Sequence, residues 1–382
     1  MVHDMVLASQ RDLFDIPDEI AYLNCAYMSP LLRSATAAGH AALARKAQPW
    51  RITAADFFTE SEVARALFAE LIGADADGVA LIPSASYGLS LAAANLPVGP
   101  GRGILLLEDQ FPSNVYPWRD LAARTGSGIA TAPRPDDLDW TAAVLERIDE
   151  RIAVVAVPQC HWTDGGRLDL ARIGESARAV GAALVVDATQ SLGAAPLDVS
   201  VVRPDFLVAA TYKWLLGPYS LGFLYAAPER RDGRPLEFTW IAREGSDDFA
   251  SLVAYRDAFR PGARRYDMGE HSNFALLPVA TTALRQILAW SVATIAATLG
   301  GLTANIEREA ERLGLAPVPA ARRVAHLIGL RAAAPFPANL PERLAAAGVY
   351  VSVRGNAIRV SPHVYNTAED VARLFAVLAA AL

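Results

Sequence analysis

Four apolar runs of the sequence stop at polar or aromatic side chains that could do chemistry. The runs are "VALIP", "GILLLED", "ALVVDATQ" and "FLVAATYK". The side chains that end or follow them are Ser84 and Ser86, Phe111 and Asn114, Asp187 and Gln190, and Tyr212 and Lys213. In open α/β sheets, ligands bind beyond the carboxyl ends of the strands. We therefore expect these side chains to meet at one site.

Lys213 and Asp187 are the pair with the most distinctive chemistry. A partly desolvated lysine at the mouth of a sheet has a lowered pKa and can form a Schiff base with an aldehyde. An aspartate on a neighbouring strand end can hold a pyridinium nitrogen protonated. Pyridoxal 5'-phosphate (PLP) is the cofactor that needs both partners, so the pair predicts PLP.

The turn "PSASYG" precedes an amphipathic run, "LSLAAANL", and predicts a helix N-terminus. Backbone N–H groups and the Ser86 hydroxyl would favour a phosphate there. Phe111 could stack on a ring face. Each of these residues could also be an ordinary turn or cap residue, and it is their occurrence on successive strand ends that favours a cofactor site.

The elements that must position these residues are short apolar strands that alternate with helices between about residues 60 and 225. "IAVVAVPQ" adds a further strand, and "SEVARALFAELIGA" and "LARIGESARAVGA" have helical spacing. Near-continuous apolar strands separated by helices are typical of a parallel sheet covered on both faces. The fold class is therefore α/β.

A second unit is expected after the charged, glycine-containing stretch 244–273. A long helix near 277–312 should come first, then two strands in "GVYVSVRGNAIRVSPH" around the turn "RGN". A final helix should open at Thr367 as N-cap. We predict a large cofactor-binding domain at 17–265, and a smaller α+β domain formed by 1–16 and 266–382.

The composition of the chain limits the kinds of molecule that it is expected to bind. The chain has 382 residues, 53% of them hydrophobic, and a formal net charge of -6 without a basic block, which argues against nucleic acid and favours a small molecule. Two cysteines without a CxxC pair fit a reducing cytoplasm. The six histidines have no ligand spacing, so no metal site is expected.

The ends and apolar segments of the sequence predict a cytoplasmic location. The start, "MVHDMVLASQRDLF", lacks the pattern of a signal peptide. The uncharged segment 287–304 approaches the length of a membrane span, but its Ser, Thr and Gly content favours a buried helix.

The run "VVDATQSLGAAPLDVSVVRPDFLVAATYKWLLGPYSLGFLY" resembles the core of the class V aminotransferase family, PLP enzymes of fold type I. The resemblance continues in "AYLNCAYMSP", "DQFPSNVYPW", "RRYDMGEHSN" and "AIRVSPHVYNTAEDV", over most of the chain. It implies a large domain with a mainly parallel, seven-stranded sheet between helices and a smaller α+β C-terminal domain. It also implies a homodimer whose subunits share their active sites.

By this resemblance Lys213 carries the Schiff base, Asp187 pairs with the pyridine nitrogen, and Gln190 lies near the ring hydroxyl. The further cofactor contacts that it implies are Ala85, Ser86, Phe111, Asn114, Tyr212, Trp240 and Asn273. Tyr212 and Phe111 resemble kynureninases, because desulfurases have histidines at both positions.

Substrate contacts are implied at Arg359, Asn24 and His161. Arg359 matches the family arginine that binds a substrate α-carboxylate, whereas Arg354, in the turn "RGN", could simply be solvated. Asn24 lies in a segment that approaches the substrate side in the family. His161 could equally be a structural histidine.

The predicted function is a PLP-dependent enzyme acting on an amino acid through a Lys213 Schiff base, by transamination or by kynureninase-like lyase or hydrolase chemistry. The alternatives are an epimerase of the same family and a non-catalytic PLP-fold binding protein. Desulfurase chemistry is disfavoured, because no cysteine follows Cys160. Glu270 stands where many family members have a threonine that reaches phosphate, and a carboxylate would repel it.

Overall fold

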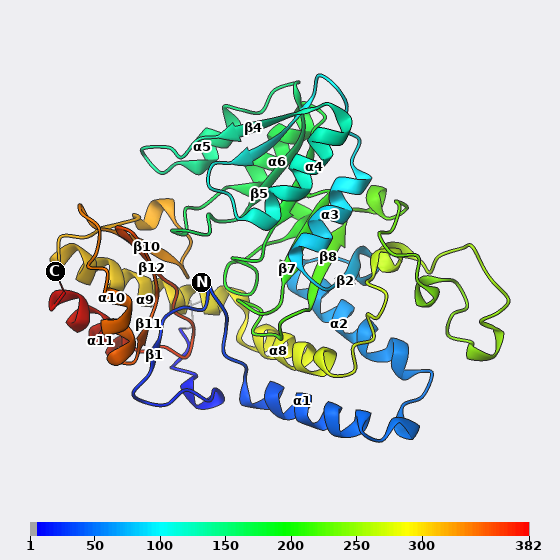
Figure 1. Ribbon diagram of the computed structural model, residues 1–382, viewed down its shortest axis with the longest axis horizontal. Coiled ribbons are helices and arrows are strands. Elements are labelled where there is room, and N and C mark those ends of the chain that lie inside the picture. Colours follow the sequence, from blue (N-terminus) through cyan, green and yellow to red (C-terminus); the bar gives the residue numbers. More distant parts are fainter. Residues whose placement is uncertain (1–5, 382) are drawn as a thin grey trace, which may run out of the picture.

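A seven-stranded sheet forms the centre of the larger part of the protein in the computed structural model, which describes residues 6–381 (Figure 1). Its order is β2-β8-β7-β6-β5-β3-β4. The strands are β2 (Val79–Ile82), β3 (Gly103–Leu107), β4 (Gly128–Ala132), β5 (Ile152–Pro158), β6 (Ala183–Asp187), β7 (Phe206–Ala210) and β8 (Gly222–Ala226). Only β8 runs antiparallel to its neighbours, so the other strands of this sheet all end at the same edge. The predicted α/β class and mainly parallel sheet are confirmed.

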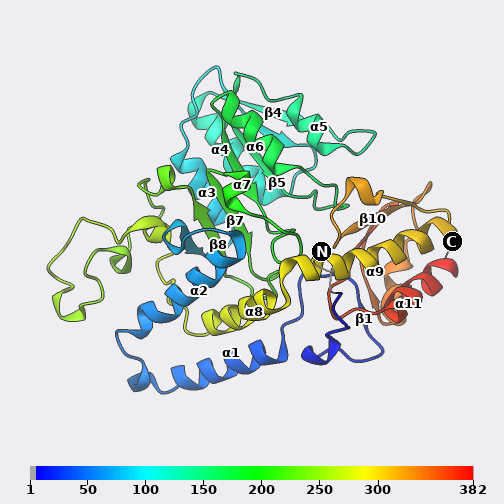
Figure 2. The same cartoon turned by 180° about the vertical axis from the view of Figure 1, so that it is seen from behind.

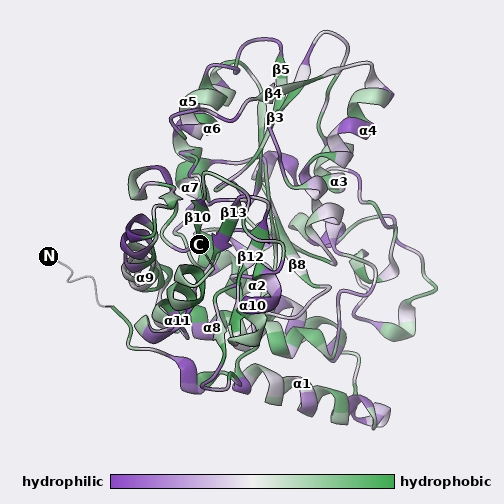
Figure 3. Ribbon diagram, turned by 60° about the vertical axis from the view of Figure 1, so that its left-hand side comes forward, coloured by the Kyte–Doolittle hydropathy of each residue, from purple (hydrophilic) through white to green (hydrophobic). Residues whose placement is uncertain are grey.

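Helices cover both faces of this sheet because successive strand residues point to opposite sides. Leu184 and Val186 of β6 pack in one core cluster with Phe68, whereas Val185 packs in a second cluster with Leu89 and Trp118. The first face carries α1 (Arg33–Lys46), α2 (Asp56–Ile72), α5 (Trp140–Leu145), α6 (Leu170–Ala179), α7 (Val199–Val202) and α8 (Leu276–Trp290), and the second carries α3 (Ala85–Asn95) and α4 (Tyr116–Thr125). In Figure 3 hydrophobic residues gather on these central strands, while α1 and α9 (Val292–Arg312) carry hydrophilic stretches.

The smaller part contains an antiparallel sheet of order β12-β13-β10-β9 and a parallel pair, β1 with β11. Its strands are β1 (Ala21–Tyr22), β9 (Ala316–Pro317), β10 (Ile328–Arg331), β11 (Val349–Tyr350), β12 (Ser352–Arg354) and β13 (Ala357–Val360). Helices α10 (Leu340–Ala346) and α11 (Ala368–Ala379) pack on them, and α9 runs from the large part into this unit (Figure 2). The predicted strands around the turn "RGN" and the Thr367 cap, which forms a capping box, are both present.

The single helix predicted near 277–312 is wrong, because the chain breaks at Ser291 into α8 and α9. Ser291 has a φ of 60° and its hydroxyl accepts a hydrogen bond from the Thr294 N–H at 3.2 Å, which starts a new helix. The uncharged segment 287–304 therefore spans two helices rather than one buried helix. Within residues 6–381 no single helix could cross a membrane by length and composition; α8 and α9 would pass only as a pair, and they are bent by 77°.

The predicted large domain at residues 17–265 stays a prediction. The packing shows which unit the segments near its two boundaries contact. Ala21 and Leu23 belong to the core cluster of the C-terminal unit, and Ala21 pairs with Val349. Helix α8, on the C-terminal side of the predicted boundary, packs against α1 and α2 of the large part. The chain therefore contributes its N-terminal segment to the small unit and one helix after residue 265 to the large one.

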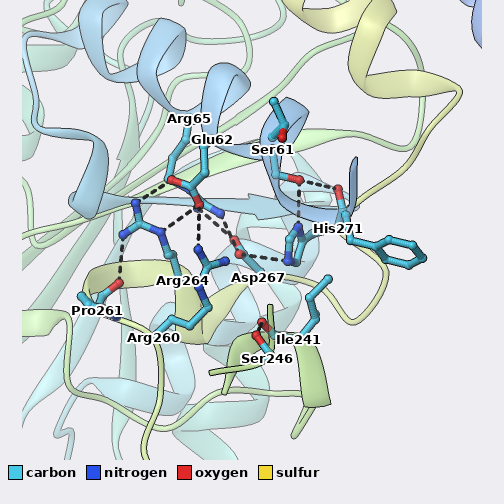
Figure 4. A network of polar contacts seen from close by, with 12 residues as sticks. Ser61, Glu62, Arg65, Ile241, Ser246, Arg260, Pro261, Arg264, Asp267 and His271 are labelled. Atoms are coloured by element: carbon cyan, nitrogen blue, oxygen red, sulfur yellow. Dashed lines mark hydrogen bonds and ion pairs between the residues drawn. The ribbon is translucent and has the colours of Figure 1, made fainter. Parts of the chain in front are cut away.

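The free edge of β2 is covered by a buried ion pair between Arg65 and Asp267 (Figure 4). Arg65 and Asp267 form two hydrogen bonds, at 3.1 and 2.8 Å, and the Leu81 N–H donates to Asp267 Oδ1 at 2.8 Å. The Met268 N–H donates in turn to the Leu81 carbonyl at 2.9 Å. These contacts provide hydrogen-bond partners for backbone groups at the edge of β2, just before the chain reaches Ser84 and α3.

We expect Asp267→Ala to destabilise the fold by about 3–5 kcal/mol, because it leaves the buried Arg65 guanidinium with only the more distant Glu62, at 3.5 Å, as a counter-charge. Urea denaturation measures the free energy of unfolding. Asp232→Ala is the matched control: Asp232 pairs with Arg265 at 2.9 Å but is almost fully exposed, so its loss should be far smaller. Equal losses in the two variants would contradict the role of the buried pair.

Candidate functional site

A cavity of about 290 Å³ lies where the carboxyl ends of β2, β3, β5, β6 and β7 meet. Seven of the predicted site residues line it: Ala85, Ser86, Phe111, Asp187, Gln190, Tyr212 and Lys213. They come from four separate strand ends, as expected from a parallel sheet. The fold therefore brings together the core of the predicted site.

The N-terminus of α3 forms one wall of the cavity. Ser84 is its N-cap and accepts a hydrogen bond from the Tyr87 N–H at 3.2 Å, which leaves the N–H groups of Ala85 and Ser86 in the first turn without intrahelical partners. Gly88 lets the helix lie close to the sheet, because a Cβ there would come within 2.6 Å of Val208 and 2.7 Å of Ile82. The backbone N–H donors and the positive end of the α3 dipole thus face the cavity, and both favour an anionic group of a ligand.

Asp187 presents a buried carboxylate at the end of β6. It is 8% exposed, and the Thr189 N–H donates to its Oδ1 at 3.0 Å. Burial raises the pKa of Asp187, and the Lys213 amine acts in the opposite direction. No ion pair to Asp187 closer than 4.0 Å exists within residues 6–381. The carboxylate therefore suits a ligand that brings its own N–H donor or positive charge.

Lys213 lies on the loop after β7, and its amine is flanked by aromatic rings. Its Nζ is 5.2 Å from the ring centre of Phe111 and 5.4 Å from that of Tyr212. Burial lowers the pKa of Lys213 to about 8, although Asp187 opposes this shift. The amine is therefore available in its neutral, nucleophilic form at much lower pH than an ordinary lysine.

Gln190 is fixed from several directions. Its Nε2 donates to the Ala26 carbonyl at 3.1 Å, and its Oε1 accepts from Trp214 Nε1 at 3.2 Å. The backbone carbonyl of Gln190 accepts from His326 Nε2 at 2.8 Å. The side chain thus borders the cavity in one orientation, set by residues that the sequence did not identify.

Three predicted cofactor contacts lie outside the cavity lining. Asn114 is buried and accepts a hydrogen bond from Trp118 Nε1 at 2.7 Å. Asn273 caps α8 by accepting from the Leu276 N–H at 2.9 Å. Trp240 is 43% exposed and packs among Phe57 and Phe249. Their cofactor roles stay predictions.

His161 also lies outside the cavity lining. It is fully buried, stacks on Trp140 at 4.8 Å, and has Thr163 Oγ1 at 2.8 Å and the Glu108 carbonyl at 3.1 Å from its two ring nitrogens. Burial lowers its pKa, so the ring is neutral. These contacts favour the structural alternative over a substrate contact.

The predicted substrate residues Arg359 and Asn24 are linked through Ser352, which the sequence did not identify. Ser352 Oγ donates to Asn24 Oδ1 at 3.0 Å and accepts from Arg359 at 3.3 Å. Arg359 also donates to the carbonyl of Trp162 at 2.8 Å, and Trp162 lines the cavity. Arg359 therefore lies directly behind the cavity wall, on the side of the small unit.

Both cysteines are buried near the site, and Cys160 lines the cavity. Burial raises the pKa of each thiol well above its usual range. Neither is therefore an activated nucleophile. Cys160, Thr189 and Tyr219 are cavity residues that the sequence analysis did not single out. Cys160 and Thr189 follow strand ends, so the rule that selected their neighbours could have found them, whereas Tyr219 does not follow a strand end.

Comparison with known proteins identifies the family of the chain. The family model described as "Aminotransferase class-V" matches residues 41–239. An uncharacterised aminotransferase of Bacillus subtilis (strain 168), YcbU, is 30% identical over 81% of this chain and 81% of its own length. The chain belongs to the class V aminotransferase family.

Other relatives carry different activities in their names. A kynureninase of Deinococcus radiodurans is 30% identical over 69% of this chain and 64% of its own length. The solved structure of a C-DES mutant with glycine covalently linked to its PLP cofactor has a TM-score of 0.86 at 19% identity, and covers 97% of this chain and 99% of that one. This last similarity shows a shared fold. The predicted family is thus confirmed, while the names of its members leave the reaction open.

We expect Lys213 to react with an acetylating reagent as a group with a pKa of about 8. Only the neutral amine reacts, so its rate should fall as the pH drops through that value and level off above it. An unperturbed lysine, with a pKa of about 10.4, would still be gaining reactivity there. Mass spectrometry of the two lysine peptides measures this, and Lys46, the other lysine of the chain, is exposed on α1 and reports reagent loss.

Asp187→Asn should lower the pKa of Lys213 further, because the carboxylate favours the charged amine. The same labelling experiment tests the sign of the shift. A midpoint that stays in place or rises would contradict the electrostatic coupling between the two strand ends.

Proposed function

We propose that the protein is a PLP-dependent enzyme that acts on an amino-acid substrate and uses Lys213 as its essential amine. The observation that carries the proposal is the joint presence, in one cavity, of the buried Lys213 amine and the buried Asp187 carboxylate, which forms no ion pair closer than 4.0 Å within residues 6–381. The serine-containing N-terminus of α3 completes a set of groups that fits an aldehyde, a pyridine nitrogen and a phosphate. The family membership supports the same cofactor.

The residues that would hold PLP follow from their chemistry. The N–H groups of Ala85 and Ser86 would bind the phosphate, Phe111 would flank the ring, and Asp187 would keep the pyridine nitrogen protonated. When bound, PLP supplies an aldehyde carbon for amines and a ring that accepts electron density from the substrate's α-carbon.

Lys213 would then act as the base and acid of the reaction. With a pKa of about 8 its Nζ can take a proton from the substrate's α-carbon near neutral pH and return it to an adjacent atom. The rings of Phe111 and Tyr212 flank this amine. Arg359 would bind the substrate's α-carboxylate with a planar guanidinium.

Transamination and kynureninase-like cleavage both begin with these groups, and we propose one of the two as the overall reaction. Epimerisation and cofactor binding without turnover are the alternatives. The two buried thiols with raised pKa values argue against desulfurase chemistry, which needs a nucleophilic cysteine. We also propose that the enzyme is a cytoplasmic homodimer whose subunits share their active sites, as the family resemblance implies.

Reduction of the PLP-loaded protein with borohydride should attach the cofactor to Lys213 alone. Because the chain has only one other lysine, peptide mapping gives a clear answer. Lys46→Ala should be labelled like the wild type, and Lys213→Ala should neither take the label nor show the yellow colour. A label on Lys46, or none on either lysine, would refute the proposal.

Product analysis with a panel of amino acids separates the reactions. A keto acid together with pyridoxamine phosphate indicates transamination, cleavage products indicate a lyase or hydrolase, and an inverted α-carbon indicates an epimerase. Lys213→Ala is expected to lose at least about a hundredfold in rate, the lower range for loss of a general acid–base group. Normal turnover by this variant would contradict the mechanism.

A further inference from the structure

Arg359 is an exception among the buried arginines of residues 6–381. Arg65 is paired with Asp267 at 2.8 Å, and Arg323 with Glu307 at 2.8 Å. Arg359 is 4% exposed, yet its hydrogen bonds go to neutral oxygens, and its Nε has no partner. A buried guanidinium without a counter-charge is costly, which points to an anion brought by a ligand.

A second guanidinium lies on the same wall. The Arg354 guanidinium carbon is 4.7 Å from the ring centre of Trp162, the residue whose carbonyl accepts from Arg359. Within the described chain, no carboxylate lies within ion-pair distance of Arg354 or Arg359. Burial lowers the pKa of Arg359 to about 10, with a smaller contribution from the charge of Arg354. Arg359 is therefore a buried positive charge, and Arg354 a solvent-exposed one, with no acidic partner among residues 6–381.

Trp162 connects these charges to the reactive amine. Its ring lies edge-on to Phe111 at 5.4 Å, and Phe111 lies 5.2 Å from Lys213 Nζ. Its Nε1 donates to the Asp109 carbonyl at 2.7 Å, which fixes the ring. A ligand that extends from Lys213 along Trp162 would lie close to the charge of Arg359 and to Arg354, which lies over the ring.

We propose that Arg354 binds a second anionic group of the substrate, so that the enzyme takes amino acids with a side-chain carboxylate. The proposal rests on the proposed function, in which Arg359 binds the α-carboxylate. A single α-carboxylate would neutralise one of the two guanidiniums, and a dicarboxylic amino acid neutralises both. The guanidinium carbon of Arg354 lies over the ring of Trp162 and the residue is exposed, so its N–H groups are accessible to a planar carboxylate.

Binding of unreactive acids to the PLP-loaded protein tests this subsite without turnover. Glutarate and pentanoate have the same chain length and differ in the second carboxylate, as do succinate and butanoate. Calorimetry should show that the wild-type protein binds each dicarboxylate at least about tenfold more tightly than the monocarboxylate of the same length. The second carboxylate adds a charge-assisted, bidentate contact. Equal affinities within each pair would overturn the proposal.

The variants separate the two arginines. Arg354→Gln should abolish the preference while keeping the affinity for pentanoate, Arg354→Lys should restore part of it, and Arg359→Gln should weaken both ligands. Arg312→Gln, which removes an exposed charge on α9 of the same unit, should leave the preference intact. Equal weakening of glutarate and pentanoate by Arg354→Gln would also overturn the proposal.

The test of the second anion subsite and the test of the proposed function can fail independently of each other. Borohydride labelling reports whether Lys213 carries the cofactor, and calorimetry reports whether a second carboxylate is recognised. A protein labelled at Lys213 that binds glutarate and pentanoate equally would keep the proposed function and reject the subsite. A protein without the label that still prefers glutarate would reject the proposed function and keep an anion site.

Discussion

The register between β6 and β7 is the constraint on which the site depends. Asp187 pairs with Val208 in the parallel ladder, so the carboxylate and the loop that carries Lys213 leave the sheet side by side. That loop is held by Thr211, whose hydroxyl donates toward the Pro218 carbonyl at 2.6 Å and whose own carbonyl accepts from the Gly217 N–H at 2.9 Å. A slip of one residue would turn Asp187 to the opposite face of the sheet, because the side-chain period of a strand is two.

The remaining walls of the cavity depend on contacts from distant parts of the chain. The Arg65–Asp267 pair secures the edge strand that leads into α3, and the N-terminal segment joins the small unit to the Lys213 loop. In that segment the Cys25 N–H donates to the Ser361 carbonyl at 3.0 Å and the Ser29 N–H to the Tyr212 carbonyl at 2.9 Å. The amine and the arginine side of the site are thereby connected through one short stretch of backbone.

Burial has different consequences for the different groups around the cavity. It lowers the pKa of Lys213 toward neutrality, raises that of Asp187, and makes the thiols of Cys25 and Cys160 unreactive. The same low polarity makes the unpaired charge of Arg359 costly. The cavity therefore favours a ligand that supplies both a positive group for Asp187 and negative groups for α3 and the arginines.

The sequence by itself determined the α/β class, the strand ends and the residues at the centre of the cavity, Asp187, Tyr212 and Lys213 among them. Apolar runs that stop at polar residues are a local pattern, and parallel strands carry their ends to one edge whatever the rest of the chain does. The break at Ser291 also had a local signal, a serine three residues before Thr294, but the continuous apolar periodicity on both sides of it predicted one helix.

Only the tertiary structure decided which of the remaining candidates face the cavity. Asn114, His161 and Asn273 have side chains suited to a ligand. Asn114 Oδ1 is engaged by Trp118, the ring nitrogens of His161 by Thr163 and Glu108, and Asn273 Oδ1 by the start of α8. The sequence also did not predict that, within residues 6–381, Arg359 has no carboxylate beside it. The contact of His161 with Glu108 and the contact of Arg359 with Trp162 join residues far apart along the chain, and local patterns carry no information about such contacts.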